Sequence, residues 1–370
     1  MASGSGSAGG PHNESGRVRL SSLDRNGFEA FALSLGLPAF RGRQMFAWIH
    51  GKGVASFAEM TDLPETLRAS LDGLAVVERA VEVARATSSD GTVKSLMKLS
   101  SGAKIETVLI PDFNDDGPSR MTACVSSQVG CAMGCTFCAT GLMGFSQNLT
   151  AGEIVDQVRF MDGLARSLYN SPLTNVVYMG MGEPLMNYHE VLKSVSIVGS
   201  RDVLGMSPKR VTVSTVGLAK RIEQLADDDA PFNLAISLHS VINEKRSRIM
   251  PVNRSERTDI AALRHAVGAY HAKTRRRVTY EYCMLKGFND SDEDAVALAK
   301  AAHWAPSKVN LIMYNAVPGS GFEPTPPDRL NHFIKILVDR NVTVTVRRSR
   351  GQDIAAACGQ LVVNETEATT

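Results

Sequence analysis

The chain has 370 residues, 44% of them hydrophobic, and a formal net charge of +2, which is the composition of an ordinary globular protein with a sizeable core. The sequence contains no apolar run long enough to span a bilayer, so we expect no membrane association. Residues 1–16 are rich in Gly and Ser and lack the apolar core of a secretion signal. We therefore expect a disordered tail and a cytoplasmic protein. In a reducing compartment, six cysteines indicate metal binding or catalysis rather than a disulfide framework.

Residues 20–74 have apolar side chains at helix-like spacing, and glycines near positions 36 and 51–53 divide the stretch into several helices. Basic residues lie among the apolar ones. They fit a solvated helical face, or a small accessory domain that touches RNA phosphates. These residues are Arg41, Arg43, His50 and Lys52.

A change to β-structure is predicted after residue 75. Residues 76–86 and 93–99 are apolar strands, and the Asp90-Gly91 pair between them predicts a hairpin. A further strand is predicted at 105–110, ended by Pro111, and a turn at 114–118 suggests a domain boundary.

From residue 117 onward, short apolar strands alternate with amphipathic helices. Such alternation is typical of parallel β/α units, and six or so of them make a partial barrel whose functional residues follow the strand ends. We therefore predict an α/β protein: a partial (β/α)6 TIM-like barrel with a small N-terminal helical accessory domain and a β-hairpin. Strands are expected at 121–126, 175–179, 210–214, 233–238, 278–282, 309–313 and 342–346. Helices are expected at 151–168, 189–198, 218–226, 259–273, 292–303 and 327–340.

The loop after the first barrel strand carries Cys131, Cys135 and Cys138 in a CxxxCxxC spacing, with Phe137 before the last cysteine. Three thiolates this close can hold one compact inorganic centre and leave part of it open to another ligand. A zinc knuckle or unrelated buried thiols are the alternatives. Zinc sites usually add a distant Cys or His pair, and the histidine nearest this loop is His189. The spacing resembles that of the radical S-adenosylmethionine (SAM) superfamily.

Small or polar residues follow the other predicted barrel strands. Glycines there let the backbone approach a ligand, and a carboxylate such as that of Glu183 could hold an ammonium group. Taken singly, each could be a plain strand–turn junction or, for His239, a core histidine. Because these residues lie at corresponding ends of the predicted strands, together they predict one pocket. The residues are Gly182, Glu183, Ser214, Ser237, Leu238, His239 and Asn315.

Near the C-terminus, Arg347, Arg348 and Arg350 suit phosphate contacts or a solvated turn. Cys358 follows among small residues and is expected to be accessible. By contrast, Cys283 lies in an apolar strand and is expected to be a core side chain.

Several strings together resemble the RlmN/Cfr family of radical-SAM adenosine methyltransferases, over residues 35–361. They are residues 41–48, 124–128, the cysteine loop, 180–184, 211–217 and 350–361. The resemblance implies an accessory RNA-contacting domain at 17–110, a radical-SAM core at 117–350 and a C-terminal segment at 351–370. It also implies an external electron donor, such as flavodoxin or ferredoxin, and we expect a monomer.

The resemblance further implies that Cys131, Cys135 and Cys138 bind a [4Fe-4S] cluster whose open iron chelates SAM. SAM contacts would come from Gly182, Glu183, Ser214, Ser237, Leu238, His239 and Asn315. Cys358 would first be methylated by one SAM, and a radical from a second SAM would activate that methyl group for addition to adenine. Cys124 would resolve the protein–RNA crosslink, leaving a disulfide with Cys358. Glu106 matches the proton acceptor.

Two methylation sites divide this family. RlmN-like members methylate carbon 2 of adenosine in 23S rRNA and tRNA, whereas Cfr-like members methylate carbon 8 and confer antibiotic resistance. Gly144, Phe145 and Asn148, with the full N-terminal domain and the C-terminal string, favour carbon 2. Gln147 and the lack of prolines around Asn315 depart from the family pattern. Two competing hypotheses are that the chain is another radical-SAM enzyme, or that it is a metal-bearing RNA-binding protein without activity.

Overall fold

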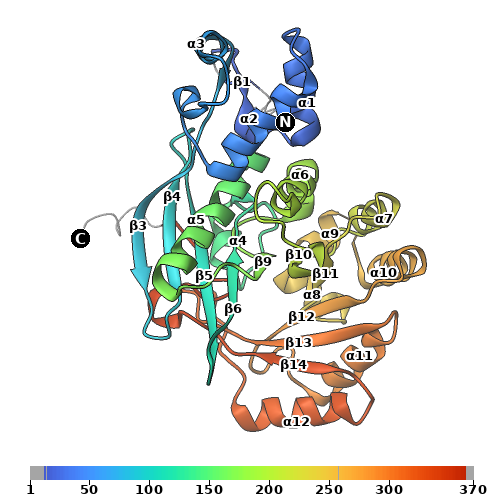
Figure 1. The fold of residues 1–370 in the computed structure, drawn as a ribbon. Helices are drawn as coiled ribbons and strands as arrows, with labels where there is room; N and C mark the ends of the chain where they lie inside the picture. The colour runs from blue at the N-terminus through green and yellow to red at the C-terminus, as the bar shows by residue number, and fades with distance from the viewer. Residues whose placement is uncertain (1–11, 14, 257, 364–370) are drawn as a thin grey trace.

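The structure is a computed structural model that describes residues 12–13, 15–256 and 258–363 (Figure 1). Most of the predicted tail at 1–16, and the last residues of the segment 351–370, lie outside the described residues. In the described part of the chain, no helix is both long enough and apolar enough to cross a membrane.

The N-terminal region is helical, as predicted. Its elements pack around buried aromatic side chains such as Phe28 and Phe46. Asp24 caps the first helix by accepting a hydrogen bond from the Gly27 amide at 2.8 Å. The unit is closed by a short parallel pair of strands, β1 (Val18–Arg19) and β2 (Ala75–Val76), that the sequence did not predict. The helices are α1 (Arg25–Ser34), α2 (Ala39–Phe46), η2 (Ala47–Lys52), η3 (Phe57–Glu59) and α3 (Glu65–Leu74).

A ten-stranded sheet organises the rest of the molecule, in the order β14-β13-β12-β11-β10-β9-β6-β5-β4-β3. The strands from β6 to β14 are parallel, and β3 to β6 are antiparallel. The sheet is therefore continuous across the turn near residue 114, because this turn joins the paired strands β5 and β6. The strands are β3 (Val81–Thr87), β4 (Val93–Lys98), β5 (Lys104–Asn114), β6 (Gly117–Cys124), β9 (Asn175–Tyr178), β10 (Val211–Thr215), β11 (Asn233–Ser237), β12 (Val278–Met284), β13 (Ser307–Met313) and β14 (Val344–Arg347).

The prediction that Pro111 ends its strand is wrong. Strand β5 continues to Asn114, and Pro111 lies opposite Met121 of β6. Strand β4 pairs with β5 only as far as Leu109. Because one edge of β5 is free beyond that residue, a residue without an N–H is tolerated there.

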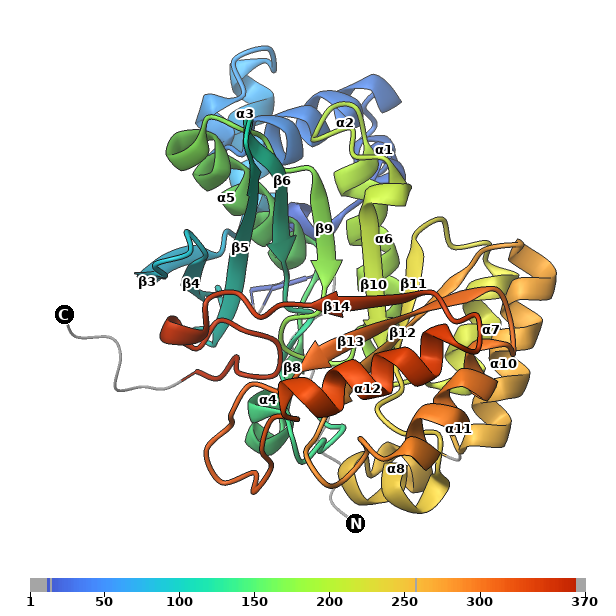
Figure 2. The same ribbon diagram turned by 90° about the horizontal axis from the view of Figure 1, so that it is seen from below.

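Helices alternate with the parallel strands, as predicted, and Figures 1 and 2 show α10, α11 and α12 along one side of β11 to β14. Thr150 and Glu153 form a capping box at the start of α5. The helices are α5 (Ala151–Tyr169), α6 (Tyr188–Gly199), α7 (Ala219–Asp227), α10 (Ile260–Thr274), α11 (Asp292–Ala302) and α12 (Pro327–Val338). The 3-10 helix η1 (Leu20–Ser22) lies within the stretch 20–74 that is predicted to be helical. The structure adds elements that the sequence did not predict: α4 (Ala139–Met143), α8 (Asn243–Ile249), α9 (Val252–Ser255), β7 (Gln128–Gly130), β8 (Phe145–Asn148), η4 (Pro184–Asn187), η5 (Pro208–Arg210) and η6 (Gln352–Ile354).

Candidate active site

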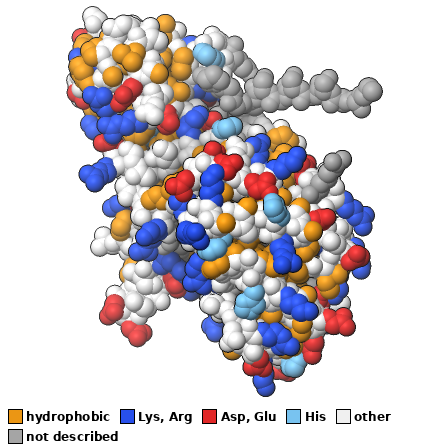
Figure 3. Space-filling view, turned by 90° about the vertical axis from the view of Figure 1, so that its right-hand side faces the viewer, with side chains coloured by type: hydrophobic (Ala, Val, Ile, Leu, Met, Phe, Trp, Pro, Cys, Tyr) orange, Lys and Arg blue, Asp and Glu red, His pale blue; other side chains and the backbone are white. Residues whose placement is uncertain are grey.

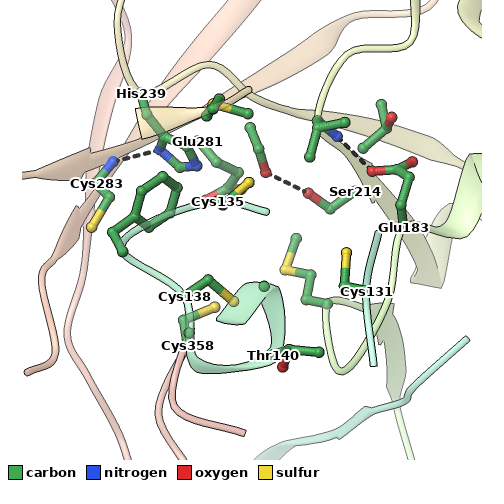
Figure 4. A pocket seen from close by; sticks show the side chains of 18 of the residues that line it. Cys131, Cys135, Cys138, Thr140, Glu183, Ser214, His239, Glu281, Cys283 and Cys358 are labelled. Carbon is green, nitrogen blue, oxygen red and sulfur yellow. Dashed lines mark hydrogen bonds between the residues drawn. The ribbon is translucent and has the colours of Figure 1, made fainter. Parts of the chain in front are cut away.

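The carboxyl ends of the barrel strands surround a cavity of about 150 Å³ (Figure 4). Its wall combines the cysteine loop after β6, the loops after β9, β10 and β11, and the C-terminal segment. Most of the predicted site residues meet here because parallel strands place their carboxyl ends at one edge. They are Cys131, Cys135, Cys138, Gly182, Glu183, Ser214, Ser237, His239 and Cys358.

The cysteine loop is held by backbone contacts. The Cys131 amide donates to the Gly144 carbonyl at 2.8 Å, and the Thr136 amide donates to the Ile249 carbonyl at 3.0 Å. Gly130 has φ +72°, and a Cβ on it would lie 1.9 Å from the Gly144 oxygen, so this position requires glycine. The loop thus has a defined shape that places its thiols around the cavity.

Burial raises the pKa of Cys131 to about 12 and also raises the pKa values of Cys135 and Cys138. Three neutral thiols facing one cavity become strong ligands once a cationic centre lowers their pKa values. In the described residues, no three His, Cys, Asp or Glu side chains converge as the ligands of one metal ion would. The three thiols lie around the cavity instead, and this donor set fits an iron–sulfur centre.

Glu183 follows β9 and is buried. Its Oε2 accepts the Val216 amide at 2.8 Å and its Oε1 accepts the Leu185 amide at 3.0 Å. Burial raises the pKa of this carboxyl group to about 7. The preceding Gly182 has φ +100°, and a Cβ there would lie 2.6 Å from the Gln128 side chain. Glycine therefore allows the chain to turn sharply enough to place the carboxylate in the cavity wall.

His239 lies opposite, at the end of β11. Its Nδ1 accepts the Cys283 amide at 2.9 Å, and Phe137 packs edge-on against the ring at 4.8 Å. Burial, together with Arg246, lowers the pKa of His239 to about 3. The imidazole is therefore neutral with its proton on Nε2, which Figure 4 shows on the ring side turned away from Cys283.

Four predicted site residues lie outside this cavity wall: Leu238, Asn315, Glu106 and Cys124. The amide of Leu238 donates to the Glu281 carbonyl at 3.0 Å, and its side chain is buried in the core. Asn315 donates from Nδ2 to the Cys358 carbonyl at 3.2 Å. Glu106 is buried, with Oε1 2.9 Å from Lys94 Nζ.

The C-terminal segment holds Cys358 at the cavity through contacts on both sides. The Ala139 amide, directly after the cysteine loop, donates to the Gly359 carbonyl at 2.7 Å. Thr140 Oγ1 donates to the Leu361 carbonyl at 2.6 Å. Further upstream, Ser88 Oγ at the hairpin tip donates to Asp353 Oδ1 at 2.6 Å.

A second cavity of about 830 Å³ opens on the other side of Cys358, between the C-terminal segment and the inner faces of the barrel strands. Met179, Glu281, Ile312 and Cys358 line both cavities. The second cavity is mainly basic, with Asp112 and Glu281 as its acidic side chains. Its basic residues are Arg120, Arg277, Lys308, Arg347, Arg348 and Arg350.

Cys124 lies at the end of β6. Burial and then the neighbouring Cys358 raise its pKa to about 12, whereas Arg347 opposes the shift. All six cysteines are free thiols, so the disulfide between Cys124 and Cys358 implied by the resemblance is not formed in this structure. Cys283 is buried, as predicted, and its side chain also lines the first cavity.

Comparisons with known proteins agree with this geometry. Residues 125–299 match the radical SAM superfamily, and residues 18–77 match the ribosomal RNA large subunit methyltransferase N-terminal domain. A Salinibacter ruber protein named probable dual-specificity RNA methyltransferase RlmN is 54% identical over 352 residues, which are 95% of either chain.

The chain belongs to the RlmN family.

Another RlmN-family protein, from Flavobacterium johnsoniae and also named probable dual-specificity RNA methyltransferase RlmN, is 44% identical over 94% of this chain and 98% of its own. A crystal structure of a radical SAM methyltransferase from Sphaerobacter thermophilus superimposes with a TM-score of 0.85 at 42% identity, covering 93% of this chain and 98% of that one. The radical-SAM part of the chain implies the use of SAM and an iron–sulfur cluster.

Sequence reasoning missed some wall residues of this RlmN-family site. Glu281 is buried within β12, accepts from Asn310 Nδ2 at 2.8 Å, and burial raises its pKa. A lone carboxylate in an apolar strand was the available signal. Thr140 carried no signal, since its contact with the C-terminal segment spans 221 positions in the sequence.

Proposed function

We propose that this protein is a radical-SAM methyltransferase that adds a methyl group to carbon 2 of adenosine in 23S rRNA and in tRNA. One observation carries the proposal: Cys358 lines both the three-cysteine cavity and the larger basic cavity. A thiol that carries a methyl group must reach the methyl donor on one side and the base on the other. The position of Cys358 supports that role.

Cys131, Cys135 and Cys138 would hold a [4Fe-4S] cluster in this site, with SAM beside it in the same cavity. Together these groups supply the one-electron chemistry that an unactivated adenine carbon requires. The wall residues that would contact SAM are Gly182, Glu183, Ser214, Ser237 and His239. Leu238 and Asn315 would support that wall from behind. Leu238 does so through its backbone hydrogen bond to Glu281, and Asn315 through its hydrogen bond to the Cys358 carbonyl.

The polar groups of the wall suit the amino-acid part of SAM. Each oxygen of Glu183 accepts one backbone amide and keeps a lone pair for an ammonium group. A bound cation would also offset the cost of burying this carboxylate. The Nε2–H group of His239 is a fixed donor, because Cys283 occupies Nδ1.

Two thiols would act in turn on the methyl group. Cys358 would accept it as a thiolate, and Arg347 would stabilise this charge, because the charge of Cys358 raises the pKa of Arg347. The carbon carried on Cys358, after loss of one hydrogen atom to the radical from the second SAM, would bond to the adenine carbon, which gives up its proton and one electron. Cys124 would then attack the sulfur of Cys358 and break the bond between this sulfur and the carbon, which takes up a proton and leaves as the methyl group of the base. The disulfide that remains is reopened by a cellular reductant. An external donor such as flavodoxin or ferredoxin would supply the electron.

The second cavity supports an RNA substrate. Its basic side chains suit phosphate contacts, and its volume of about 830 Å³ suits a nucleotide. The printed names of the relatives, dual-specificity RNA methyltransferases, support more than one RNA substrate. Gly144, Phe145 and Asn148 favour carbon 2 over the alternative, carbon 8, within the family.

The test is a methylation assay with anaerobically reconstituted protein, SAM, a reductant, and either a 23S rRNA fragment or tRNA. Nucleoside digestion should yield 2-methyladenosine from both RNAs with the unmodified protein and none with Cys358→Ala. Gln360→Ala, a change in the same segment that removes no thiol, should still yield product. Formation of 8-methyladenosine would establish the alternative. Cleavage of SAM without any methyladenosine would indicate a radical-SAM enzyme with another substrate.

A further inference from the structure

A buried arginine lies next to the cysteine loop. Arg246 belongs to helix α8 and is 0% exposed. The last residue of that helix, Ile249, accepts the backbone amide of Thr136 from the cysteine loop at 3.0 Å. The helix is thus attached to the loop whose thiols face the cavity.

All hydrogen-bond acceptors of Arg246 are neutral oxygens. Its Nη1 donates to Asn253 Oδ1 at 2.6 Å and to the Thr258 carbonyl at 3.1 Å. Its Nε donates to the Leu238 carbonyl at 3.2 Å, and its Nη2 donates to the Val216 carbonyl at 2.5 Å. Arg246 therefore ties the loop after β10 to the loop that carries His239.

Lys94, the other buried lysine or arginine in the described part of the chain, has a carboxylate partner. Lys94 Nζ lies 2.9 Å from Glu106, and the part-buried Arg79 lies 2.7 Å from Asp156. For Arg246, no carboxylate of the described residues lies within ion-pair distance. Burial lowers its pKa to about 10, so it remains charged at neutral pH. A buried charge is costly without a counter-charge, and neutral hydrogen bonds offset only part of that cost.

The acidic group whose charge acts on Arg246 is the Cys135 thiol of the cysteine loop. The charge of Cys135 favours the protonated guanidinium, and Arg246 in turn opposes the rise that burial causes in the pKa of Cys135. A cluster held by three thiolates carries net negative charge, and one more negative charge after it takes up an electron. A fixed positive charge close by favours the reduced form over the oxidised form.

We propose that the iron–sulfur cluster is the counter-charge of Arg246, and that Arg246 thereby stabilises the bound cluster and makes its one-electron reduction easier. The inference rests on the proposed function, in that Cys131, Cys135 and Cys138 hold the cluster. The electron comes from the external donor. Arg246 lines neither of the two cavities, so its role is positioning and electrostatic.

The test is a redox titration of the reconstituted cluster, without RNA, followed by electron paramagnetic resonance of the reduced form. At the potential where the wild-type cluster is half reduced, Arg246→Gln should lower the reduced-to-oxidised ratio at least tenfold, a shift of about 59 mV. Arg246→Lys keeps the charge and should stay near wild type. Arg79→Gln is the matched control, a part-buried arginine with its own carboxylate, and should leave the potential unchanged.

A second variant tests the charge without removing the arginine. Asn253→Asp places a carboxylate at the atom that already accepts from Arg246, and it should lower the ratio as Arg246→Gln does. This variant also serves if Arg246→Gln fails to fold. Equal potentials in the wild type and Asn253→Asp would overturn the proposal, as would an equal shift in Arg246→Lys and Arg246→Gln.

Thermal unfolding with and without the cluster gives a readout that is independent of reduction. Cluster loading should raise the Tm of the wild type more than that of Arg246→Gln. Arg79→Gln should lower the Tm of the cluster-free protein and that of the cluster-loaded protein by the same amount. An equal gain in the wild type and Arg246→Gln would show a purely structural arginine. If the wild-type protein itself takes up no cluster by visible absorption, the proposed function fails rather than this inference.

Discussion

At the residue scale, burial and hydrogen bonding decide what each side chain can do. Glu106 illustrates this, because the resemblance assigned it as a proton acceptor. In the structure its Oε1 lies 2.9 Å from Lys94 Nζ and its Oε2 accepts the Val362 amide at 2.8 Å. Both charged side chains are buried. These contacts favour a role for Glu106 in anchoring the segment that carries Cys358.

Removing this anchor should cost stability. Glu106→Ala leaves Lys94 buried without its partner, and we expect a loss of about 3–5 kcal/mol in the free energy of unfolding. The Lys94→Met/Glu106→Leu pair removes both charges and should recover most of that loss. Denaturant unfolding measures both effects.

Hydrogen exchange separates anchoring from proton transfer. The Val362 amide should exchange faster in Glu106→Ala and also in the Lys94→Met/Glu106→Leu pair, because either change removes its acceptor. Unchanged exchange at Val362 would contradict the anchoring role and leave proton acceptance as the explanation for Glu106.

At the element scale, the N-terminal helices depend on a buried histidine. His50 lies in η2, its Nε2 is 2.9 Å from the Leu23 carbonyl, and the rings of Phe28 and Phe46 pack against it. The Nδ1 atom is buried without a hydrogen-bond partner. Burial lowers the pKa of His50 to about 3. The folded protein therefore requires the neutral imidazole.

This shift predicts a pH dependence of stability. The pKa of His50 is near 6.5 in the unfolded chain and lower in the folded one, so the unfolded state binds a proton first as the pH falls. The contribution of the neutral His50 to the free energy of unfolding is complete above pH 6.5. It decreases by about 1.4 kcal/mol per pH unit between pH 6.5 and about 3. Unfolding free energies at pH 7.5 and 5.5 should therefore differ by about 1.4 kcal/mol more in the wild type than in His50→Gln. Equal pH dependence in both proteins would show that His50 does not titrate on unfolding.

At the scale of the whole molecule, one sheet joins the hairpin to the barrel, and Arg79 attaches the N-terminal unit by reaching Asp156 of α5 at 2.7 Å. The net charge of +2 is small, and Figure 3 shows groups of Lys and Arg side chains interspersed with Asp and Glu on one face. Positive charge is instead gathered locally, around the cavity next to Cys358. We therefore expect RNA binding to depend on that cavity rather than on the overall charge.

Arg348 tests this expectation, because it is exposed and lines the second cavity. Arg348→Gln should weaken binding to different RNA sequences about equally and reduce the slope of log K against log salt by about 1. Arg264→Gln, an exposed change on α10, is the control and should alter neither quantity. Filter binding over a series of salt concentrations measures both. A slope equal to that of the wild type would show that Arg348 contacts no phosphate.

Local patterns predicted most of the fold. The helices and strands of the barrel lie within a few residues of their expected ranges, because each pattern depends on neighbours in sequence. The short helices α8 and α9 were not predicted, and Pro111 did not end its strand. The formation of α8 depends on its contact with the cysteine loop, which is distant in sequence. The continuation of β5 past Pro111 depends on where its pairing with β4 ends.

The sequence by itself determined the barrel, the three-cysteine loop and the meeting of most strand-end residues, since the carboxyl ends of parallel strands must meet at one edge. Only the tertiary structure decided that Cys358 lies between two cavities, that Glu106 pairs with Lys94, and that Arg246 is buried beside the cysteine loop without a carboxylate. These arrangements join segments up to 265 positions apart, as Ser88 and Asp353 are. Burial and long-range hydrogen bonds fix their geometry, and neither leaves a periodic signal in the chain.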